Sequence, residues 1–306
     1  MSMHTLRLLR FKIFLLVATL PLFACSSNKP IRFTDSPTNH CAAITGGSGA
    51  MLSEYLTPVA DKMKKQTGVY VLEQGIEAML SRAWLTEHAE KTIDVQYFIF
   101  STDNVGLIAT DYLVKAAERG IKVRVLVDDI MVEANGEDLL TLSKQENLSI
   151  KIYNPMANVG KNLFEKVVNL TTNFHQLNQR MHNKTFTVDG QVSITGGRNV
   201  ADEYFGYDHE YNFRDRDVML VGGEANKIQA SFELFWQSEL SVDVQDLIKD
   251  SQPSQTPPNF SALHEYACDP VNFAPSVREK IKDMPAVIAA IQTNQELQWL
   301  SDVEYV

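Results

Sequence analysis

The strongest constraint on the fold is a strand, a helix and a second strand that follow one another within about 35 residues. The run Ile93–Phe100 is rich in β-branched and aromatic residues, which favours a strand. Thr102 or Asp103 can cap the helix that follows, Gly120 can end it, and Ile121–Leu126 is typical of a second strand. A crossover of this kind joins parallel strands of one sheet, so the sequence predicts an α/β fold.

The rest of the chain adds further elements around this unit. The sequence predicts helices over residues 74–90 and 161–178, strands over 149–153 and 217–221, a hairpin turning at Asp189-Gly190, and a helix that begins at Gly222-Gly223. The amphipathic 161–178 segment is expected to pack on the core, with a lid or lipid-facing surface as the alternative. We therefore expect one folded domain over residues 51–250, followed by a linker and C-terminal tail over residues 251–306.

The N-terminus has the pattern of a secretory signal. A basic stretch precedes an apolar run of about 12 residues, Ile13–Ala24, which is too short to span a bilayer. The run ends at Cys25 in a sequence that resembles a bacterial lipoprotein box, with an ordinary cleaved signal as the alternative. The prediction is a lipoprotein signal over residues 1–25, lipidation of Cys25, and a polar tether over residues 26–50. Such a protein is anchored in the bacterial cell envelope at the periplasmic face, and Ser26 resembles the pattern for the outer membrane.

The charge balance disfavours nucleic acid as a partner. The chain has 28 basic and 38 acidic residues, a net charge of −10. Removal of residues 1–25, with Arg7, Arg10 and Lys12, leaves 25 basic against 38 acidic residues, or −13. Nucleic-acid binders usually have the opposite sign, because contacts to phosphates supply much of their affinity.

Cysteine and histidine spacing says little about metals or disulfides. With Cys25 lipidated, Cys41 and Cys268 remain, and either a disulfide or two free thiols is consistent with an oxidising compartment. Neither a Cys-x2-Cys nor a His-Glu-x2-His pattern occurs in the sequence. The spacing is therefore consistent with a protein that needs no metal, and no cofactor is predicted.

One motif carries groups suited to phosphate chemistry. His182 and Lys184 stand two residues apart, so in a strand both side chains leave the same face. An imidazole with a pKa of about 6.5 is largely neutral at neutral pH and can attack phosphorus, while the ammonium compensates charge on the phosphoryl oxygens. Gly196 and Gly197 would let backbone N–H groups approach the phosphate, and the amide of Asn199 would donate to it. Together these residues predict a phosphoryl-transfer site.

This motif, with Asp189 seven residues after His182, resembles the HKD motif of the phospholipase D superfamily. The stretches TIDVQYFIF, GIKVRVLVDD, LNQRMHNKTFTVDG, ITGGRNVADEYFG and DRDVMLVG resemble the N-terminal half of C-type bacterial cardiolipin synthases, from about Thr67 to Leu240. The resemblance implies a mixed, mostly parallel sheet flanked by helices, one half of the usual two-repeat architecture. It also implies transfer of a phosphatidyl group between phospholipids, such as phosphatidylglycerol and phosphatidylethanolamine, through a phosphohistidine and without metal.

The resemblance also implies roles for individual residues. His182 is the nucleophile, Lys184 and Asn199 bind phosphate, and Asp189 completes the motif, although its place in the hairpin favours a turn and positioning role. A downstream acidic residue usually orients the histidine; Asp215 is the first candidate and Asp217 the second, with surface ion pairs as the alternative for both.

Members of this superfamily combine two such motifs, whereas the other six histidines here lack a lysine two residues on. The expected partner is a second copy of the chain or a separate chain with its own motif, unless the chain is a truncated remnant. Three functions follow: a phosphatidyltransferase, a phospholipase D-type hydrolase or nuclease that uses the same site, or an inactive half-enzyme lipoprotein that serves as an interaction module.

Overall fold

The computed structural model describes residues 51–128, 136–155, 180–207, 211–247, 258–272 and 297–305. The chain divides into two compact units, residues 1–30 and 31–306, and every described residue belongs to the second. The predicted signal, lipidation site and tether lie outside the described residues, as do the amphipathic helix predicted for 161–178 and most of the predicted linker.

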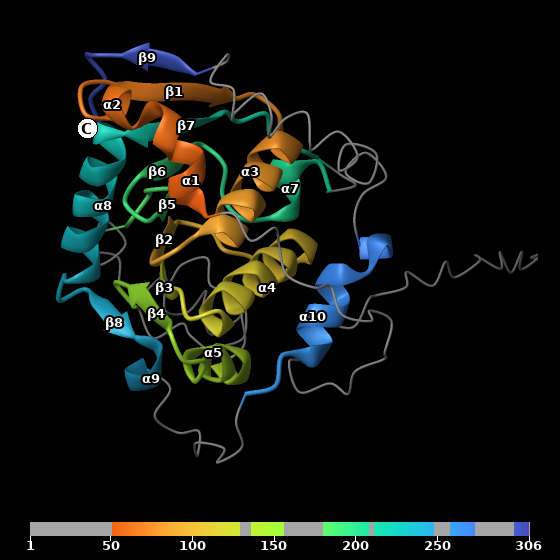
Figure 1. The fold of residues 1–306 in the computed structure, drawn as a ribbon. Helices are drawn as coiled ribbons and strands as arrows, with labels where there is room; N and C mark the ends of the chain where they lie inside the picture. The colour runs from red at the N-terminus through yellow and green to blue at the C-terminus, as the bar shows by residue number, and fades with distance from the viewer. Residues whose placement is uncertain are drawn as a thin grey trace, which may run out of the picture. The chain divides into compact units, whose positions relative to one another are not determined.

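Nine strands form one sheet in the described part of the chain (Figure 1). They are β1 (Thr67–Leu72), β2 (Thr92–Tyr97), β3 (Lys122–Asp128), β4 (Leu148–Tyr153), β5 (Thr185–Val188), β6 (Val192–Gly196), β7 (Asp217–Gly222), β8 (Ser241–Asp243) and β9 (Gln298–Leu300). Their order across the sheet is β8-β4-β3-β2-β5-β6-β7-β1-β9. The predicted hairpin, β5 and β6, therefore lies in the middle of the sheet beside the first predicted strand, β2.

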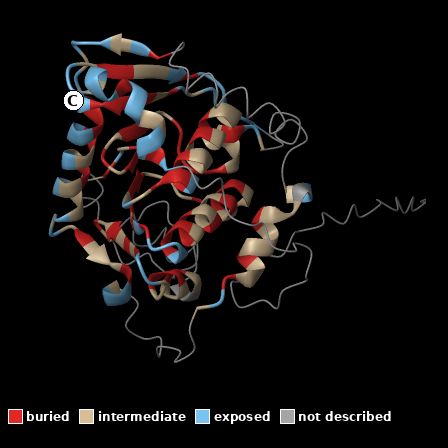
Figure 2. Ribbon diagram, viewed as in Figure 1, coloured by how far each residue is buried: buried red, intermediate tan, exposed pale blue. Residues whose placement is uncertain are grey.

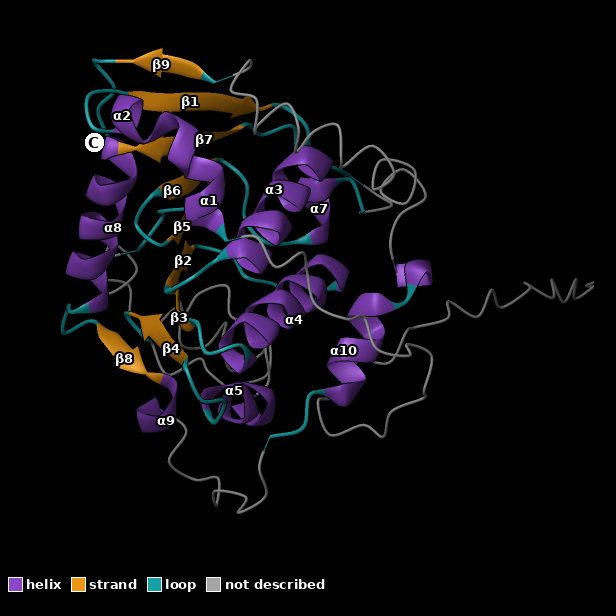
Figure 3. Cartoon of the chain, viewed as in Figure 1, coloured by secondary structure: helices purple, strands orange, loops and turns teal. Residues whose placement is uncertain are grey.

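Helices lie on both faces of this sheet (Figure 3). They are α1 (Leu52–Leu56), α2 (Ala60–Met63), α3 (Gly75–His88), α4 (Asn104–Glu118), α5 (Gly136–Ser143), α7 (Asp202–Phe205), α8 (Gly223–Trp236), α9 (Val244–Leu247) and α10 (Ser261–Cys268), with short 3-10 turns at Thr57–Val59 and Pro270–Asn272. The helices α3 and α4 pack side by side, α8 packs against β2, β5, β6 and β7, and α10 packs on α4.

The predicted α/β fold with a mixed sheet flanked by helices is confirmed, but the expectation that the sheet is mostly parallel is wrong. Only the pairings of β2 with β3 and of β3 with β4 are parallel among the described strands. The other six pairings are antiparallel. The crossover helix fixes the direction only of the strands that it connects, β2 and β3. The hairpin β5–β6 pairs antiparallel with β2, and β7, β1 and β9 then add to β6 one after another, each antiparallel to its neighbour.

The local signals around the crossover helix act as the sequence predicts. Asp103 is the N-cap of α4, and its carboxylate accepts a 2.9 Å hydrogen bond from the backbone N–H of Gly106. The helix ends before Gly120, whose φ of 91° is a left-handed conformation that favours glycine. The following strand begins at once, which brings β3 back beside β2.

The two faces of the sheet differ in character, because alternate residues of each strand point to opposite sides. Toward α3 and α4, strand β2 presents Ile93, Val95 and Tyr97, all buried in the main apolar core (Figure 2). Toward α8 it presents Asp94, which pairs with Arg124 at 2.7 Å, and the same guanidinium reaches Glu233 of α8. Strand β2 therefore meets α3 and α4 through apolar side chains, whereas its α8 face includes buried ion pairs.

Candidate active site

The segment that carries His182 enters the sheet through a buried anchor. The carboxylate of Asp128, at the end of β3, accepts a 2.9 Å hydrogen bond from the backbone N–H of Met181. It also forms a 2.8 Å ion pair with the guanidinium of Arg180. The Met181 side chain is buried against Leu126. Arg180 and Met181, the two residues before His182, are therefore held in place, while the histidine itself is exposed.

Lys184 and His182 converge as the sequence predicts. The Lys184 ammonium lies 3.3 Å from both ring nitrogens of His182 and donates a 2.9 Å hydrogen bond to the His182 carbonyl oxygen. Equal distances to the two nitrogens place the ammonium over the face of the imidazole, because in the ring plane it would collide with a ring carbon. The imidazole itself is exposed to solvent.

The surroundings of this pair are partly apolar. Phe98, just beyond the end of β2, has its ring centre 4.9 Å from that of His182, and the Lys184 ammonium lies 5.7 Å from the same ring. Lys184 is only 6% exposed. Its burial lowers the pKa of the ammonium, and the negative charge of Asp215 works in the opposite direction. A positive charge held in a weakly solvated site acts strongly on a phosphate.

Asp215 lies close enough to this pair for its charge to act on Lys184. A side chain at Gly197 would come within 2.9 Å of the Asp215 carboxyl carbon, so glycine is needed for this close approach. The charge of Asp215 acts on both Lys184 and Tyr204. Within the described residues, however, no hydrogen bond joins Asp215 to His182, so its role in orienting the histidine stays a prediction.

The second candidate, Asp217, has a structural place, and the alternative of a surface ion pair is wrong for it. Its side chain is fully buried and pairs with Arg82 of α3 at 2.8 Å and with Arg198 at 3.6 Å. The guanidinium of Arg198 also donates to the carbonyl oxygens of Leu72 and Glu73, 3.0 and 2.7 Å away. This buried network joins β7, α3 and the end of β1 beneath the site.

Asn199 and the two glycines contribute through packing. The Asn199 side chain is 2% exposed; its oxygen accepts a 3.0 Å hydrogen bond from the Ile99 N–H, and its nitrogen donates to the Tyr204 hydroxyl at 2.9 Å. A contact between this amide and phosphate therefore stays a prediction. The expectation that the backbone N–H of Gly197 binds phosphate is wrong, because this N–H donates to the Arg216 carbonyl oxygen.

Gly196 has no room for a side chain, because a Cβ there would lie 2.4 Å from the Arg216 carbonyl oxygen and from an Asp217 carboxylate oxygen. This glycine therefore permits the close pairing of β6 with β7, at the register Gly196 opposite Asp217. The structure does not place it as an open phosphate-binding turn.

Asp189 lies at the opposite end of β5 from His182, and a catalytic role for it is wrong. Its carboxylate accepts hydrogen bonds of 2.7–2.9 Å from the backbone N–H groups of Glu90, Lys91 and Thr92. Its φ of 52° is the left-handed conformation that aspartate tolerates in a tight hairpin. The turn and positioning role favoured by the hairpin pattern is the one that the structure shows.

Sequence reasoning missed two residues beside the site. Asp128 ends a strand of the parallel part of the sheet, where ligand-facing groups commonly gather, and this position was the available signal. Tyr204 follows Asn199 by five residues on a short helix, and nothing in the local sequence marks it. Burial raises the pKa of Tyr204, although the hydrogen bond from Asn199 acts in the opposite direction. Its hydroxyl thus stays protonated at neutral pH.

Searches for metal and membrane features apply to the described residues alone. They contain no group of three histidine, cysteine, aspartate or glutamate residues placed to hold a metal ion. Of the helices described, none combines the length and the apolarity required to cross a bilayer. Cys268, at the end of α10, is disulfide-bonded, and its partner lies outside the described residues. A bridge to Cys41 therefore stays a prediction.

Comparison with known proteins identifies the kind of domain that carries this site. Residues 85–236 match the family described as cardiolipin synthase, PLD-like domain. The chain contains a phospholipase D-like domain. The match includes the His182–Lys184 pair, the hairpin and α8, and so covers the phospholipase D-like domain from α3 onward.

Two relatives cover part of the same region. The chain is 34% identical over 220 residues to an uncharacterized protein of Helicobacter pylori, a match that covers 69% of this chain and 43% of that protein. It is 34% identical over 199 residues to cardiolipin synthase C of Escherichia coli, covering 64% of this chain and 41% of that one. The chain thus spans less than half the length of these relatives.

Among solved structures, phosphatidylserine synthase of Haemophilus influenzae is similar with a TM-score of 0.46 and 14% identity, over 76% of this chain and 48% of that one.

Proposed function

We propose that the chain is a phosphatidyltransferase of the cardiolipin synthase kind that acts through a phosphohistidine at His182. The observation that carries the proposal is the exposed imidazole with a largely buried ammonium over its face. Two findings support phospholipids as the substrates. The chain contains a phospholipase D-like domain, and its sequence is 34% identical over 199 residues to that of a cardiolipin synthase. Phosphatidylglycerol and phosphatidylethanolamine are the proposed donors.

In the proposed reaction, a neutral ring nitrogen of His182 attacks the phosphorus of one phospholipid and displaces its alcohol headgroup. Lys184 stabilises the negative charge that builds on the non-bridging oxygens. The displaced alkoxide takes a proton from a second histidine. The hydroxyl of a second lipid then returns that proton and attacks phosphorus, which releases His182 and forms the product diester.

The second histidine must come from outside the single motif of this chain. We propose a second copy of the chain, related by a twofold axis, or a separate chain with its own HKD motif. We also propose that Cys25 is lipidated and holds the domain at the periplasmic face of the membrane, with the outer membrane favoured.

The experiment that tests the function uses the purified full-length protein and vesicles of phosphatidylglycerol and phosphatidylethanolamine. The expected products are cardiolipin and free headgroup alcohol, and solution mass should show a dimer. His182→Ala should form neither product, and Lys227→Met on the exposed part of α8 should behave as the wild type. Phosphatidic acid without cardiolipin would instead identify a hydrolase. A monomeric wild type that forms no product, even after a separate chain with its own HKD motif is added, would refute the proposed enzymatic activity. It would favour the interaction module.

A further inference from the structure

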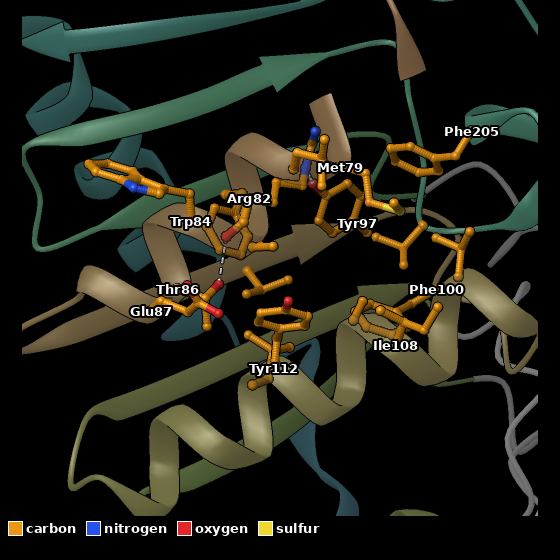
Figure 4. A pocket seen from close by; sticks show the side chains of 18 residues that line it. Met79, Arg82, Trp84, Thr86, Glu87, Tyr97, Phe100, Ile108, Tyr112 and Phe205 are labelled. Atoms are coloured by element: carbon orange, nitrogen blue, oxygen red, sulfur yellow. Dashed lines mark hydrogen bonds between the residues drawn. The ribbon is translucent and has the colours of Figure 1, made fainter. Parts of the chain in front are cut away.

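An apolar cavity of about 310 Å³ lies between α3, α4 and the central sheet (Figure 4). It is lined on α3 by residues from Met79 to Glu87, on α4 by residues from Val105 to Leu113, and at the base by Val95, Tyr97 and Phe186. Figure 4 shows Phe100 and Phe205 at one end and Trp84 and Glu87 at the other, with Tyr112 between. The cavity is distinct from the His182 site, which lies just before the first residue of β5.

Three polar side chains of the lining, Arg82, Thr86 and Tyr97, are already hydrogen-bonded within the protein. The Thr86 hydroxyl donates a 2.7 Å hydrogen bond to the Arg82 carbonyl oxygen. The Arg82 guanidinium donates to the Tyr97 hydroxyl at 2.9 Å, to the Ala78 carbonyl oxygen at 2.9 Å and to Asp217 at 2.8 Å. Apart from Glu87, Tyr112 and Trp84, the remaining side chains of the lining are aliphatic or Phe and Met, so the lining favours a ligand that is mostly hydrocarbon.

The size of the cavity fits one hydrocarbon chain. At about 310 Å³ the cavity is of the size of ligand pockets, which begin at roughly 300 Å³. From Met79 to Glu87 the α3 wall rises about 12 Å at ~1.5 Å per residue. An acyl chain occupies roughly 15 Å in one leaflet of a bilayer whose core is ~30 Å thick. The cavity is therefore long enough for most of one acyl chain.

The lining also leaves apolar surface in contact with water. Met79, Leu80, Ala83 and Ala109 are intermediate in exposure although they line the interior of the cavity. Covering such surface is favourable by about 25 cal/mol per Å². The exposed Glu87 marks one end of the cavity, where it meets solvent.

We propose that this cavity binds one acyl chain of a phospholipid, separately from the headgroup chemistry at His182. The proposal rests on the proposed function for the source of the chain, while the cavity itself argues for a hydrocarbon of any source. One wall is formed by Val200 and Phe205, which neighbour Asn199 and Tyr204 in sequence. A bound chain therefore packs against the loop whose polar side chains support the catalytic site.

The test uses the full-length protein with Trp236→Phe and Trp299→Phe, which leaves Trp84 in the cavity wall as the remaining tryptophan. The probe is a monomeric lysophosphatidylglycerol with a 12-carbon chain brominated near its end, since bromine quenches tryptophan on contact. We expect saturable quenching of Trp84. Free 12-carbon alcohol should compete, because the chain and not the headgroup is recognised.

Filling the cavity should remove this binding. We expect Ala109→Phe to weaken the probe at least tenfold, while Ala230→Phe, the same exchange on an exposed position of α8, leaves it unchanged. Ala83→Leu, which fills the cavity from α3, serves as a second variant if Ala109→Phe fails to fold. His182→Ala should bind the probe as the wild type does, which separates this proposal from the proposed function. Absent quenching, or equal quenching in a folded cavity-filled variant, would overturn it.

Discussion

Replacement of Lys184 by methionine should separate catalysis from stability. Methionine is similar in length and apolar, so it can occupy the same buried space without the ammonium. Two effects on stability oppose each other. The exchange removes the 2.9 Å hydrogen bond to the His182 carbonyl oxygen and the attraction of Asp215, and it also removes the cost of burying a charge.

Because these terms are each about 1–2 kcal/mol and opposite in sign, we expect the free energy of unfolding of Lys184→Met to change by less than about 1 kcal/mol. The effect on transfer should be much larger. Loss of one preorganised charge-stabilising group costs about 2.7–4 kcal/mol of transition-state stabilisation, or a fall in kcat of roughly 100-fold to 1,000-fold.

The assay is the initial rate of cardiolipin formation from labelled phosphatidylglycerol vesicles, with urea unfolding measured on the same preparations. Lys227→Met, at a lysine whose side chain is 60% exposed, is the matched control and should keep both values. A folded Lys184→Met protein with kcat within about threefold of the wild type would show that the ammonium over the imidazole is not part of the chemistry.

Three further results are expected. Asp128→Asn should lower kcat roughly tenfold to 100-fold with little change in KM, because it loosens the carboxylate that holds the Met181 N–H next to the histidine; unchanged kcat would contradict this positioning role. Asp189→Asn should lower the free energy of unfolding in urea by about 1–3 kcal/mol without altering kcat in the folded protein, and a large loss of kcat would restore a catalytic role. His264 is the pH-sensitive contact of α10: burial alone would lower its pKa, but the hydrogen bond with Asp111 raises it overall above 6.5. Its stabilising contribution should therefore be full below pH 6.5 and be lost as pH rises through the higher folded-state pKa, and in urea unfolding His264→Gln should remove that loss.

The elements of the fold could be read from local patterns, and their pairing could not. The periodicity of residues 93–126 and the glycine at 120 predicted β2, α4 and β3, because these signals are local. The direction of the other strands depends on which edge of β2 the hairpin joins. That choice rests on packing between residues about 90 apart in sequence, such as Val95 opposite Phe186.

The same distinction holds for the site. The spacing of His182 and Lys184 was enough to predict that their side chains converge. The structural roles of Asp189, Asp217 and Gly197 depend on partners that are distant in the sequence. These partners are residues 90–92, Arg82 and the Arg216 carbonyl oxygen, respectively. The motif therefore predicted correctly that His182 and Lys184 converge, and it also contained residues whose place is to hold the framework.

The most direct measurement of the central claim is to trap the intermediate. The full-length protein, with any second motif it requires, is mixed with phosphatidylglycerol labelled in its diacylglycerol part and quenched after a few milliseconds in guanidinium chloride at neutral pH, because phosphohistidine is labile in acid and the acyl esters are labile in base. Peptide mass spectrometry should find the phosphatidyl adduct on His182, and Lys184→Met should accumulate it more slowly. Cardiolipin formed at the normal rate with no adduct on His182, or with the adduct on another residue, would contradict the account.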